Sequence, residues 1–462
     1  MISHDVLMAM LPEHLLLAGI VLLVGLEIAG RWQRASLAVA LLSVAAAAVA
    51  AASLSFDGYA AAPFAGQFSV DPATLLAKAV VLAMALPVLL MARDEFEGGE
   101  FAVLLLSSLY GVRLLQSADS VLTLFLGLEL MSIPVYTLVL LAYRRPQSAE
   151  AALKYLVLGG TATAMFLMGA SLLYGTSGSM AIETFSRSLG ATDTLARAAV
   201  VLVILAFFLK AAIVPFHTWA PDAYEGASVP VTAYMAVLVK AGVLLAVVRL
   251  FGNAKLASPM LELLAVLPLV SIVWGNLAAM RQPSLRRMIA YSSIAHAGYL
   301  FYALLGEPAG RLQAVAFYVL AYGLLNLLAF AALPAAADDR ERDRLDNLKG
   351  LFQRSPFAAL MIGIAMLSLA GIPPFPGFVA KFLIFKNVIA AGHITYAVLG
   401  LVGSYLGIYF YLRVIQLMFM SPDVPAVAEG TAIRKLALGA SLACLAATAL
   451  VSVFPGWVLL RL

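Results

Sequence analysis

The sequence predicts an all-α protein that crosses a membrane many times. Its 462 residues are 63% hydrophobic and only 12% charged, and the mean hydropathy is +0.99. Soluble globular domains do not reach such values. Apolar runs of roughly 20 residues, the length that crosses a bilayer as a helix, recur along the whole chain. We therefore expect a polytopic membrane protein with about fourteen transmembrane helices.

The expected helices follow the apolar runs, and their ends fall at short stretches rich in charged residues, glycine or proline. The expected spans are 12–30, 35–54, 73–93, 101–117, 119–143, 150–175, 195–216, 229–251, 258–280, 284–304, 311–336, 356–390, 394–419 and 432–459. The residues before the first span include His4 and Asp5, where a cleavable signal would carry positive charge. We therefore expect this span to be retained.

Two of the spans contain the same proline-centred pattern. Residues 211–216 and 370–375 share Ala-x-Ile-x-Pro-Phe. Proline opens a helix, and lipid-facing backbone does not tolerate unpaired groups, so both breaks must face protein or water. A lysine accompanies each break at membrane depth, Lys210 at the first and Lys381 at the second, and we expect the two to hold analogous positions. Broken helices that carry charge are typical of an ion path.

Further charges lie deep in apolar spans. Glu129 stands within LTLFLGLELMSIPVY, where a carboxylate costs several kcal/mol unless it is paired, hydrated or protonated. We expect it to lie close to Lys210. Lys240 is central in its span, and buried lysines suit a proton relay because their surroundings adjust their charge. His217 and His296 titrate near neutrality and would bridge longer gaps through water.

Each of these residues also has a structural interpretation. Buried charges can be ion pairs that hold helices together. His217 could cap carbonyls freed by the first break, and His296 could be a packing histidine. Lys154 follows Glu150 by one helical turn, so a surface pair explains it as well as a role in a channel. Arg113 is expected to extend to the membrane surface from a helix end, and Gln116 stands where an apolar residue is expected, without a functional account.

Several classes of function are excluded. The chain has one cysteine, Cys444, which rules out thiolate-bound iron–sulfur clusters, structural zinc and internal disulfides. No glycine-rich nucleotide loop follows a strand pattern, so we expect no cofactor in this chain. The net charge of +4 comes with no nucleic-acid patch.

The distribution of basic residues predicts the orientation in the membrane. Alternate connections are rich in arginine and lysine, and by the positive-inside bias they are cytoplasmic, which leaves both termini on the periplasmic side. The basic residues of these connections are Arg31, Arg34, Arg144, Arg145, Arg281, Arg286, Arg287, Arg340, Arg342, Arg344, Lys349 and Arg354.

Five strings carry a family resemblance. They are LFLGLELMSIPVY, AEAALKYLVLGG, FFLKAAIVPFHTWAPDAYEGASVPVTAYMAVLVKAG, LRRMIAYSSIAHAGYLF and MLSLAGIPPFPGFVAKF. With them the chain resembles, over nearly its whole length, subunit N of bacterial complex I, the proton-pumping NADH:quinone oxidoreductase, within the wider family of antiporter-like subunits. PFHTWAPDAYEGASVPVTAY is the stretch that separates subunit N from subunits L and M.

The resemblance implies a fold with two inverted five-helix repeats, helices 4–8 and 9–13, in which helices 7 and 12 are broken. It divides the chain into 1–100 (helices 1–3), 101–251 (first repeat), 252–419 (second repeat) and 420–462 (helix 14). One departure is PPFPGFVAKF, where family members often carry PPTAGF-like text; it keeps the lysine but alters the context of the second break.

The resemblance also implies roles. Glu129 and Lys210 would form a switching ion pair, Lys240 the central relay and Lys381 the group nearest the outer exit, with His217 and His296 along the hydrated axis. The chain would be a non-redox subunit of a translocase in the bacterial inner membrane, coupled to quinone reduction elsewhere. Its partners would be homologous antiporter-like subunits, small membrane subunits and the lipid bilayer.

Two other readings stay open. In one, the chain is a subunit of a multi-subunit sodium/proton antiporter, with no redox partner. In the other, it is a structural spacer without an ion path. The conjunction of four deep charges, Glu129, Lys210, Lys240 and Lys381, argues against the spacer.

Overall fold

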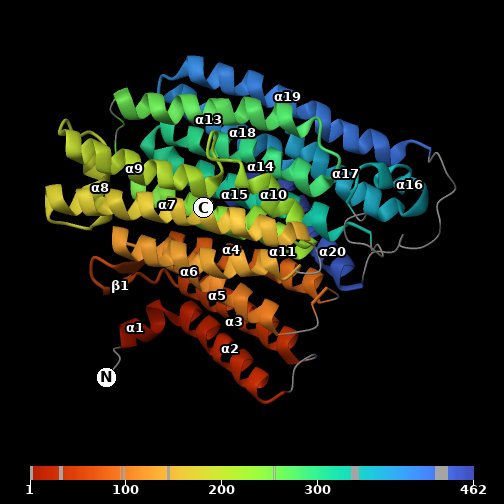
Figure 1. Cartoon of the computed structure of the whole chain (residues 1–462), viewed down its shortest axis with the longest axis horizontal. Helices are drawn as coiled ribbons and strands as arrows, with labels where there is room; N and C mark the ends of the chain where they lie inside the picture. The colour runs from red at the N-terminus through yellow and green to blue at the C-terminus, as the bar shows by residue number, and fades with distance from the viewer. Residues whose placement is uncertain are drawn as a thin grey trace.

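The computed structural model describes residues 4–30, 35–93, 95–96, 99–142, 146–252, 254, 256, 258–334, 343–421 and 435–461. The described part of the chain is a bundle of long helices (Figure 1). Twelve of them are long and apolar enough to cross a membrane. The prediction of a polytopic all-α membrane protein is confirmed.

The helices before the first break run in chain order as α1 (His4–Ala9), α2 (Leu11–Ile28), α3 (Ala35–Phe56), α4 (Pro72–Ala92), α5 (Glu100–Ser117), α6 (Val121–Leu140), α7 (Pro146–Ser177) and α8 (Ile182–Ser188). The spans expected from the apolar runs match α2 to α7 to within a few residues at most ends. Asp71, Ser120 and Asp193 explain three of the helix starts, because each side chain accepts a bond from the first turn of the helix that follows it.

The remaining helices are α9 (Thr194–Ala211), α10 (Trp219–Gly226), α11 (Val229–Tyr234), α12 (Lys240–Phe251), α13 (Ser258–Ala279), α14 (Leu285–Tyr302), α15 (Pro308–Ala331), α16 (Leu351–Arg354), α17 (Pro356–Ala370), α18 (Pro376–Ala390), α19 (Ile394–Phe419), α20 (Lys435–Val453) and α21 (Pro455–Leu459). The π-helical turn η1 (Met235–Val239) joins α11 to α12, and the 3₁₀ turns η2 (Ala303–Leu305) and η3 (Asp346–Leu348) are short connections. The twelve candidate spans, together with α5 and the broken pair α17–α18, account for the fourteen expected helices.

Both predicted breaks are present and have the same backbone form. Between α9 and α10, Ala212 adopts a left-handed conformation with φ of 62°, and between α17 and α18, Gly371 does so with φ of 86°. These two residues hold the same place in the shared pattern. Bonds to freed backbone groups satisfy the first break: the Trp219 indole donates to the Leu209 carbonyl at 2.9 Å, and Val214 N–H donates to Ser271 at 2.9 Å. Trp219, rather than His217, therefore caps the Leu209 carbonyl.

The centre of the bundle is the continuous segment of α11, η1 and α12. All of the 18-residue window that marks this span is buried, compared with 94% for α14 with η2 and 89% for α15. By contrast, α2, α3 and α20 each bury a third or less of theirs, so they form part of the outer wall. A π-turn inside an α-helix is rare and often marks a functional site. Here it immediately precedes Lys240.

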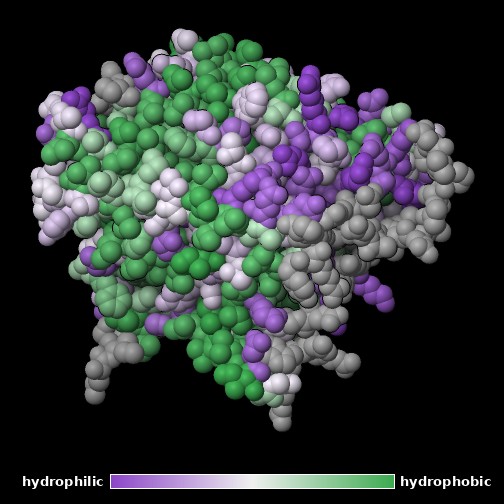
Figure 2. Space-filling view, viewed as in Figure 1, coloured by the Kyte–Doolittle hydropathy of each residue, from purple (hydrophilic) through white to green (hydrophobic). Residues whose placement is uncertain are grey.

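The two ends of the bundle differ in character. At one end lie α1, α8 and a hairpin of β1 (Ala61–Phe64) and β2 (Phe68–Val70), which nothing in the hydropathy pattern indicates (Figure 1). The opposite end holds α16. Figure 2 shows hydrophilic residues gathered around α10 and α16, while hydrophobic residues cover most of the rest of this face.

The basic connections can be followed only in part. Arg281, Arg286, Arg287, Arg344, Lys349 and Arg354 belong to the described residues, and an isolated β-bridge between Ser284 and Arg344 holds two of the connections together. Arg31, Arg34, Arg144, Arg145, Arg340 and Arg342 lie outside the described residues. The side of the membrane that each end faces stays a prediction, as does the division into repeats.

Candidate functional site

Glu129 and Lys210 lie close together between α6 and α9, as expected. The Lys210 ammonium is 3.6 Å from Glu129 Oε1 and donates to Ser132 Oγ at 2.9 Å and to the Tyr136 hydroxyl at 3.3 Å. Glu129, Ser132 and Tyr136 are spaced three and four residues apart, which places them on one face of α6. On the other side, Thr163 of α7 donates to Glu129 Oε1 at 2.5 Å. The pair is thus held by hydroxyl groups from two helices, α6 and α7.

This geometry allows the two charges to part. Lys210 is buried while 23% of the Glu129 side chain is exposed. The Ser132 and Tyr136 hydroxyls solvate the ammonium whether or not Glu129 is charged, and the Thr163 hydroxyl does the same for the carboxylate. The separation of 3.6 Å leaves an attraction between the two groups that a change in either charge removes.

Lys240 has no carboxylate partner among the described residues. Its ammonium donates to the Ser293 carbonyl at 2.6 Å and also contacts the Ser293 hydroxyl, which lies 3.3 Å from the Tyr224 hydroxyl. Lys240 therefore connects α12 with α14 and, through Ser293, with α10. Neutral partners solvate the ammonium without fixing its proton, because a carbonyl and a hydroxyl carry no net charge.

His296 lies deeper along α14, enclosed by tyrosines. Its Nδ1 is 2.7 Å from the Tyr318 hydroxyl and its Nε2 is 3.0 Å from the Tyr411 hydroxyl, and the Tyr322 ring packs against it at 4.6 Å between centroids. The charges of Lys381 and Lys240 both act on His296. The histidine is therefore fully hydrogen-bonded, as a packing histidine is, and it also lies between the two lysines.

Lys381 turns back toward the second break. Its ammonium donates to the carbonyls of Leu369 and Ala370, both at 3.1 Å, which end α17, and it lies 5.4 Å from the centroid of the Tyr299 ring. The C-terminal end of a helix carries partial negative charge, which favours a cation there. Tyr299 in turn packs against His296 at 5.5 Å. Lys381 thus faces the bundle interior, as expected, and does not extend to a lipid headgroup.

The positions of Lys210 and Lys381 are not analogous, which corrects the expectation. Lys210 is in the last turn of α9, before its break, whereas Lys381 is in α18, after its break. In the register of the shared pattern, Asp222 is the counterpart of Lys381, because each follows its motif phenylalanine by the same number of residues. Proline patterns align the breaks but do not show on which side a functional side chain lies.

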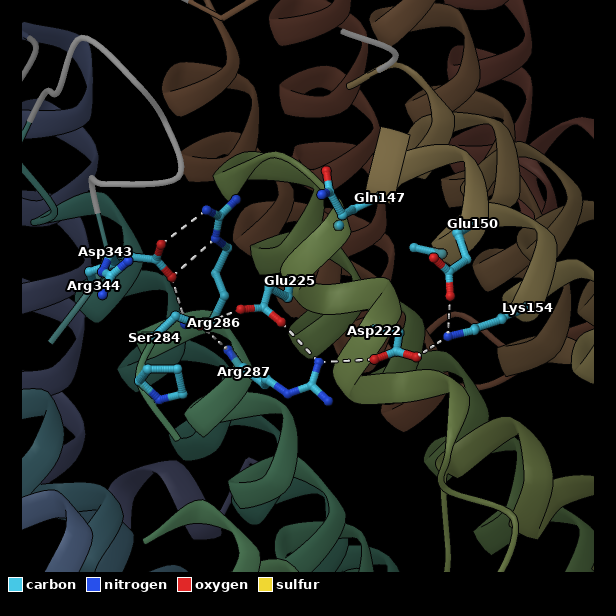
Figure 3. A pocket seen from close by; sticks show the side chains of 13 residues that line it. Gln147, Glu150, Lys154, Asp222, Glu225, Ser284, Arg286, Arg287, Asp343 and Arg344 are labelled. Atoms are coloured by element: carbon cyan, nitrogen blue, oxygen red, sulfur yellow. Dashed lines mark hydrogen bonds and ion pairs between the residues drawn. The ribbon is translucent and has the colours of Figure 1, made fainter. Parts of the chain in front are cut away.

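Asp222 belongs to a pocket of about 550 Å³ at the hydrophilic end of the bundle. Lys154 donates to Asp222 at 2.6 Å, and Arg287 bonds to Asp222 and to Glu225, both at 2.9 Å (Figure 3). Lys154 also pairs with Glu150 at 2.7 Å. The helix pair expected for Lys154 is therefore present, and it extends into a chain of alternating charges across α7, α10 and α14.

Two further observations define this pocket. Arg286 binds Asp343 through both carboxylate oxygens at 3.0 and 3.1 Å and donates to the Ala227 carbonyl at 2.7 Å. Burial by itself would raise the pKa of Asp222, but the hydrogen bonds and charges of Lys154 and Arg287 outweigh it, so the pKa lies below its ordinary value. Asp222 is therefore a carboxylate at neutral pH.

His217 follows the first break but turns toward α13. The Trp274 indole donates to His217 Nε2 at 2.9 Å. None of the hydrogen bonds described for His217 reaches Lys240 or His296. Its place along the hydrated axis therefore stays a prediction.

Comparisons with known proteins identify the family of the chain. The family model described as NADH:quinone oxidoreductase/Mrp antiporter, TM, matches residues 118–407. The chain belongs to this family. Curated relatives in it include NADH-quinone oxidoreductase subunit N of Pelobacter propionicus, 38% identical over 91% of this chain and 90% of the relative, and that of Chloroflexus aggregans, 40% identical over 79% and 78%. The resemblance to subunit N is therefore confirmed.

Solved structures of the family show the same fold. A chain of respiratory complex I from Thermus thermophilus is 36% identical, with a TM-score of 0.85 over 97% of this chain and 98% of that one. A chain of the Mrp complex from Dietzia sp. is 23% identical, with a TM-score of 0.83 over 98% and 96%. At that identity the second likeness concerns the fold alone.

The structure also reveals a buried group of charged side chains that lies outside the strings that carry the family resemblance. Lys78 of α4 bonds to Glu13 of α2 at 2.6 Å, and both side chains are fully buried. Arg113 is also fully buried and donates to the Lys78 carbonyl at 2.5 Å, so the expectation that it extends to the membrane surface is wrong. The signal in the sequence was three charges within otherwise apolar spans, but pairing between residues 65 positions apart leaves no local spacing to recognise.

Proposed function

We propose that this chain is the antiporter-like, proton-translocating membrane subunit of a bacterial NADH:quinone oxidoreductase. Protons move through the interior by way of Glu129, Lys210, Lys240, His296 and Lys381, coupled to quinone reduction in other subunits. The observation that carries the proposal is the row of three lysines, each solvated by neutral hydroxyl or carbonyl groups on a broken or π-wound helix. Groups of this kind are costly in a membrane and mark ion pathways.

The arrangement accounts for proton movement by electrostatics. Adjacent like charges in a low-dielectric interior disfavour one another, so a proton gained by one lysine favours its loss from the next. Separation of Glu129 from Lys210 removes the one nearby negative charge described for Lys210, and its proton then becomes easier to release. His296, with a tyrosine hydroxyl on each nitrogen, passes a proton between the Lys240 and Lys381 regions.

We also propose a membrane location and a set of partners for the chain. The chain lies in the bacterial inner membrane with both termini on the periplasmic side, and it carries no redox cofactor of its own. Its outer helices present exposed apolar side chains, for example Leu42 of α3 and Tyr405 of α19, to lipid and to neighbouring membrane subunits. The complex I membership of the Thermus thermophilus chain supports such partners.

The alternative is a subunit of a multi-subunit sodium/proton antiporter. The Mrp likeness supports only the fold, whereas curated relatives at 35–40% identity are named subunit N. The two functions differ in their energy source. Proton uptake into inverted membrane vesicles that requires NADH and quinone supports the redox-coupled function, and sodium-driven proton exchange without either would support the antiporter.

The test of the path uses Lys240. In the assembled enzyme, Lys240→Met should lower quinone-coupled proton pumping about tenfold or more, because the relay loses its only titratable group in α12 near Ser293. Electron transfer from NADH to an artificial acceptor should stay unchanged. Lys240→Arg should fail as well, since a guanidinium does not release its proton. Wild-type pumping by an assembled Lys240→Met enzyme would remove Lys240 from the path.

A further inference from the structure

A second group of buried charges lies outside the proton path, between α2, α4 and α5. It consists of Glu13, Lys78 and Arg113, all with no exposed surface, and Gln116, which is 4% exposed. We call these four residues the N-terminal charge cluster. Lys78 donates to Glu13 Oε1, and Arg113 donates to the Lys78 carbonyl. The cluster contains one carboxylate and two cations.

Many polar atoms of the cluster have no partner. Within the described part of the chain, Glu13 Oε2, Arg113 Nε and Nη2, and both side-chain polar atoms of Gln116 make no hydrogen bond. Buried polar groups are nearly always satisfied by protein or by ordered water. So many unsatisfied atoms in one place, both donors and acceptors, indicate bound water rather than a dry ion pair.

A cleft reaches the cluster from the surface. It has a volume of about 300 Å³ and is lined by Thr74, Ala77, Gln116 and Arg249, among others. Thr74 and Gln116 lie one helical turn from Lys78 and Arg113 on α4 and α5, so the cleft ends beside the cluster. A water molecule needs about 10–15 Å³ of such volume, so the cleft holds several.

On the side of the β1–β2 hairpin, an aromatic ring covers the cluster. The Phe68 ring of β2 covers the Lys78 ammonium at 4.7 Å from its centroid. Phe68 packs with Leu54, Val70 and Leu75 in a small hydrophobic group of its own, apart from the main core. The hairpin therefore acts as an apolar cover over Lys78, while Gln116 stays in contact with the cleft.

We propose that the N-terminal charge cluster is a second proton-binding site, in which Lys78 exchanges a proton with water in the cleft at Gln116. When the ammonium of Lys78 gives its proton to a water molecule, a hydronium ion forms and the nitrogen keeps the electron pair. The net charge of the cluster then falls from +1 to zero, with Glu13 and Arg113 still opposite in sign. Rebinding of the proton reverses the step.

Several groups set the electrostatics of this exchange. Glu13 brings negative charge to Lys78, whereas Arg113, which keeps its proton, and Arg249 bring positive charge. The titratable or charged groups that face the cluster are Glu13 of α2, Tyr110 and Arg113 of α5, Tyr234 of α11 and Arg249 of α12, the last paired with Asp119 at 2.6 Å.

The cluster also has a link to the helix that bears Lys240. The charge of Arg113 acts on Tyr234, whose hydroxyl donates to Ser108 Oγ at 2.7 Å, one and a half turns from Arg113 along α5. Tyr234 ends α11, directly before the π-turn and Lys240. The cluster therefore adjoins the central segment, and the site would serve the same proton translocation.

The test uses two variants that fix opposite charge states. Lys78→Arg keeps the positive charge and the pairing with Glu13 but does not release a proton. Lys78→Met mimics the deprotonated state and leaves Glu13 and Arg113 to neutralise each other. Protons pumped per NADH oxidised should fall about twofold or more in both assembled enzymes, because neither side chain can exchange a proton. A purely structural pair predicts instead that Lys78→Arg pumps normally.

Lys240→Met is measured in parallel, because the inference rests on the proposed function. If Lys240→Met abolishes pumping and both Lys78 variants pump at the wild-type ratio, the second site is disproved and the path stands. If Lys240→Met also pumps normally, the proposed function fails. Where Lys78→Arg does not assemble, the pumping ratio of Lys78→Met decides between normal and impaired exchange.

Access to the cleft is tested independently of pumping. The chain has a single cysteine, Cys444, which is buried, so one introduced thiol can be followed on this subunit. Gln116→Cys should react with a hydrophilic, membrane-impermeant thiol reagent in one orientation of the membrane vesicles. The neighbouring Leu115→Cys, fully buried and away from the cleft, is the matched control. Labelling of Gln116→Cys no faster than Leu115→Cys in both orientations would refute a wet cleft.

Discussion

At the scale of the residue, neutral partners distinguish Lys240 and Lys381 from Lys154. Lys154 has two carboxylates within 2.7 Å and is held as a surface cation. Lys240 and Lys381 bond to carbonyls, and Lys240 also to a hydroxyl. Two carboxylates around a partly exposed lysine keep it charged, whereas a lysine solvated by dipoles can be charged or neutral at a modest difference in energy.

The Glu129–Lys210 pair gives the first prediction at this scale. Glu129→Gln should lower coupled pumping about tenfold or more, because the amide keeps the bond from Thr163 but carries no charge to attract Lys210. Glu129→Asp should keep a measurable part of the activity. Both are compared by pumping rate at equal complex content in membranes. Equal pumping by the Gln variant and the wild type would contradict a switching role.

Lys381 gives the second prediction at this scale. Lys381→Met should slow proton release several-fold, because the carbonyls that end α17 lose their cation, while the fold survives because Met fills a similar volume. Lys386→Met is the matched control, since Lys386 lies on the same half-helix but is exposed. Stopped-flow measurement with a pH dye compares proton release by the Lys381→Met and Lys386→Met enzymes. Parallel behaviour of the two variants would argue for a general effect on α18.

At the scale of the element, the broken helices show what the sequence can and cannot predict. The spans follow from run length, and the breaks from their prolines. The side on which each lysine falls, the hairpin over Lys78 and the pairing of Glu13 with Lys78 do not follow, because tertiary contacts across many residues decide them. The departure at Phe375 and Pro376 leaves the second break with the same left-handed residue position as the first.

The left-handed residues of the breaks give a third prediction. Ala212→Gly should raise the thermal stability of the complex-bound subunit, since alanine at a φ of 62° is strained by about 1 kcal/mol relative to glycine. Gly371→Ala should lower it by about 1 kcal/mol or more, because the strain is added and the new Cβ would meet Lys381 at 3.1 Å. Thermal unfolding of the purified complex measures both. Shifts of the same sign would show that the two breaks are not equivalent in backbone terms.

At the scale of the whole molecule, ion pairs at the hydrophilic end of the bundle join helices that are far apart in the sequence. Arg287, Asp222 and Lys154 connect α14, α10 and α7, and Arg286 ties α14 to Asp343. The pocket of about 550 Å³ between them is lined by equal numbers of acidic and basic side chains. It therefore suits a structural joint between helices rather than the binding of an ion. It links α14 to α10, the half-helix that follows the first break.

The fourth prediction concerns this joint and pH. The pKa of Asp222 is lowered in the folded state, so its contribution to stability is present above the ordinary pKa of aspartate and is lost as the pH falls through the folded value. Asp222→Asn should lower stability by about 1 kcal/mol at pH 7, because the bonds to two cations are partly exposed. The difference from wild type should disappear at acid pH, as followed by thermal unfolding. A difference that persists unchanged below pH 3 would mean that the carboxylate charge is not its source.

The π-turn of the central segment has one more consequence, which concerns rotation. Each residue of an α-helix turns the chain by about 100°, so a π-turn acts as one extra residue that reorients everything after it. Deletion of a single residue from Met235–Val239 would let the segment relax into a regular α-helix of the same apolar character. Hydropathy and membrane insertion would hardly change, but the face of α12 that carries Lys240 would swing away from Ser293. The direction in which Lys240 points is thus set by the number of residues before it and not by any side chain beside it.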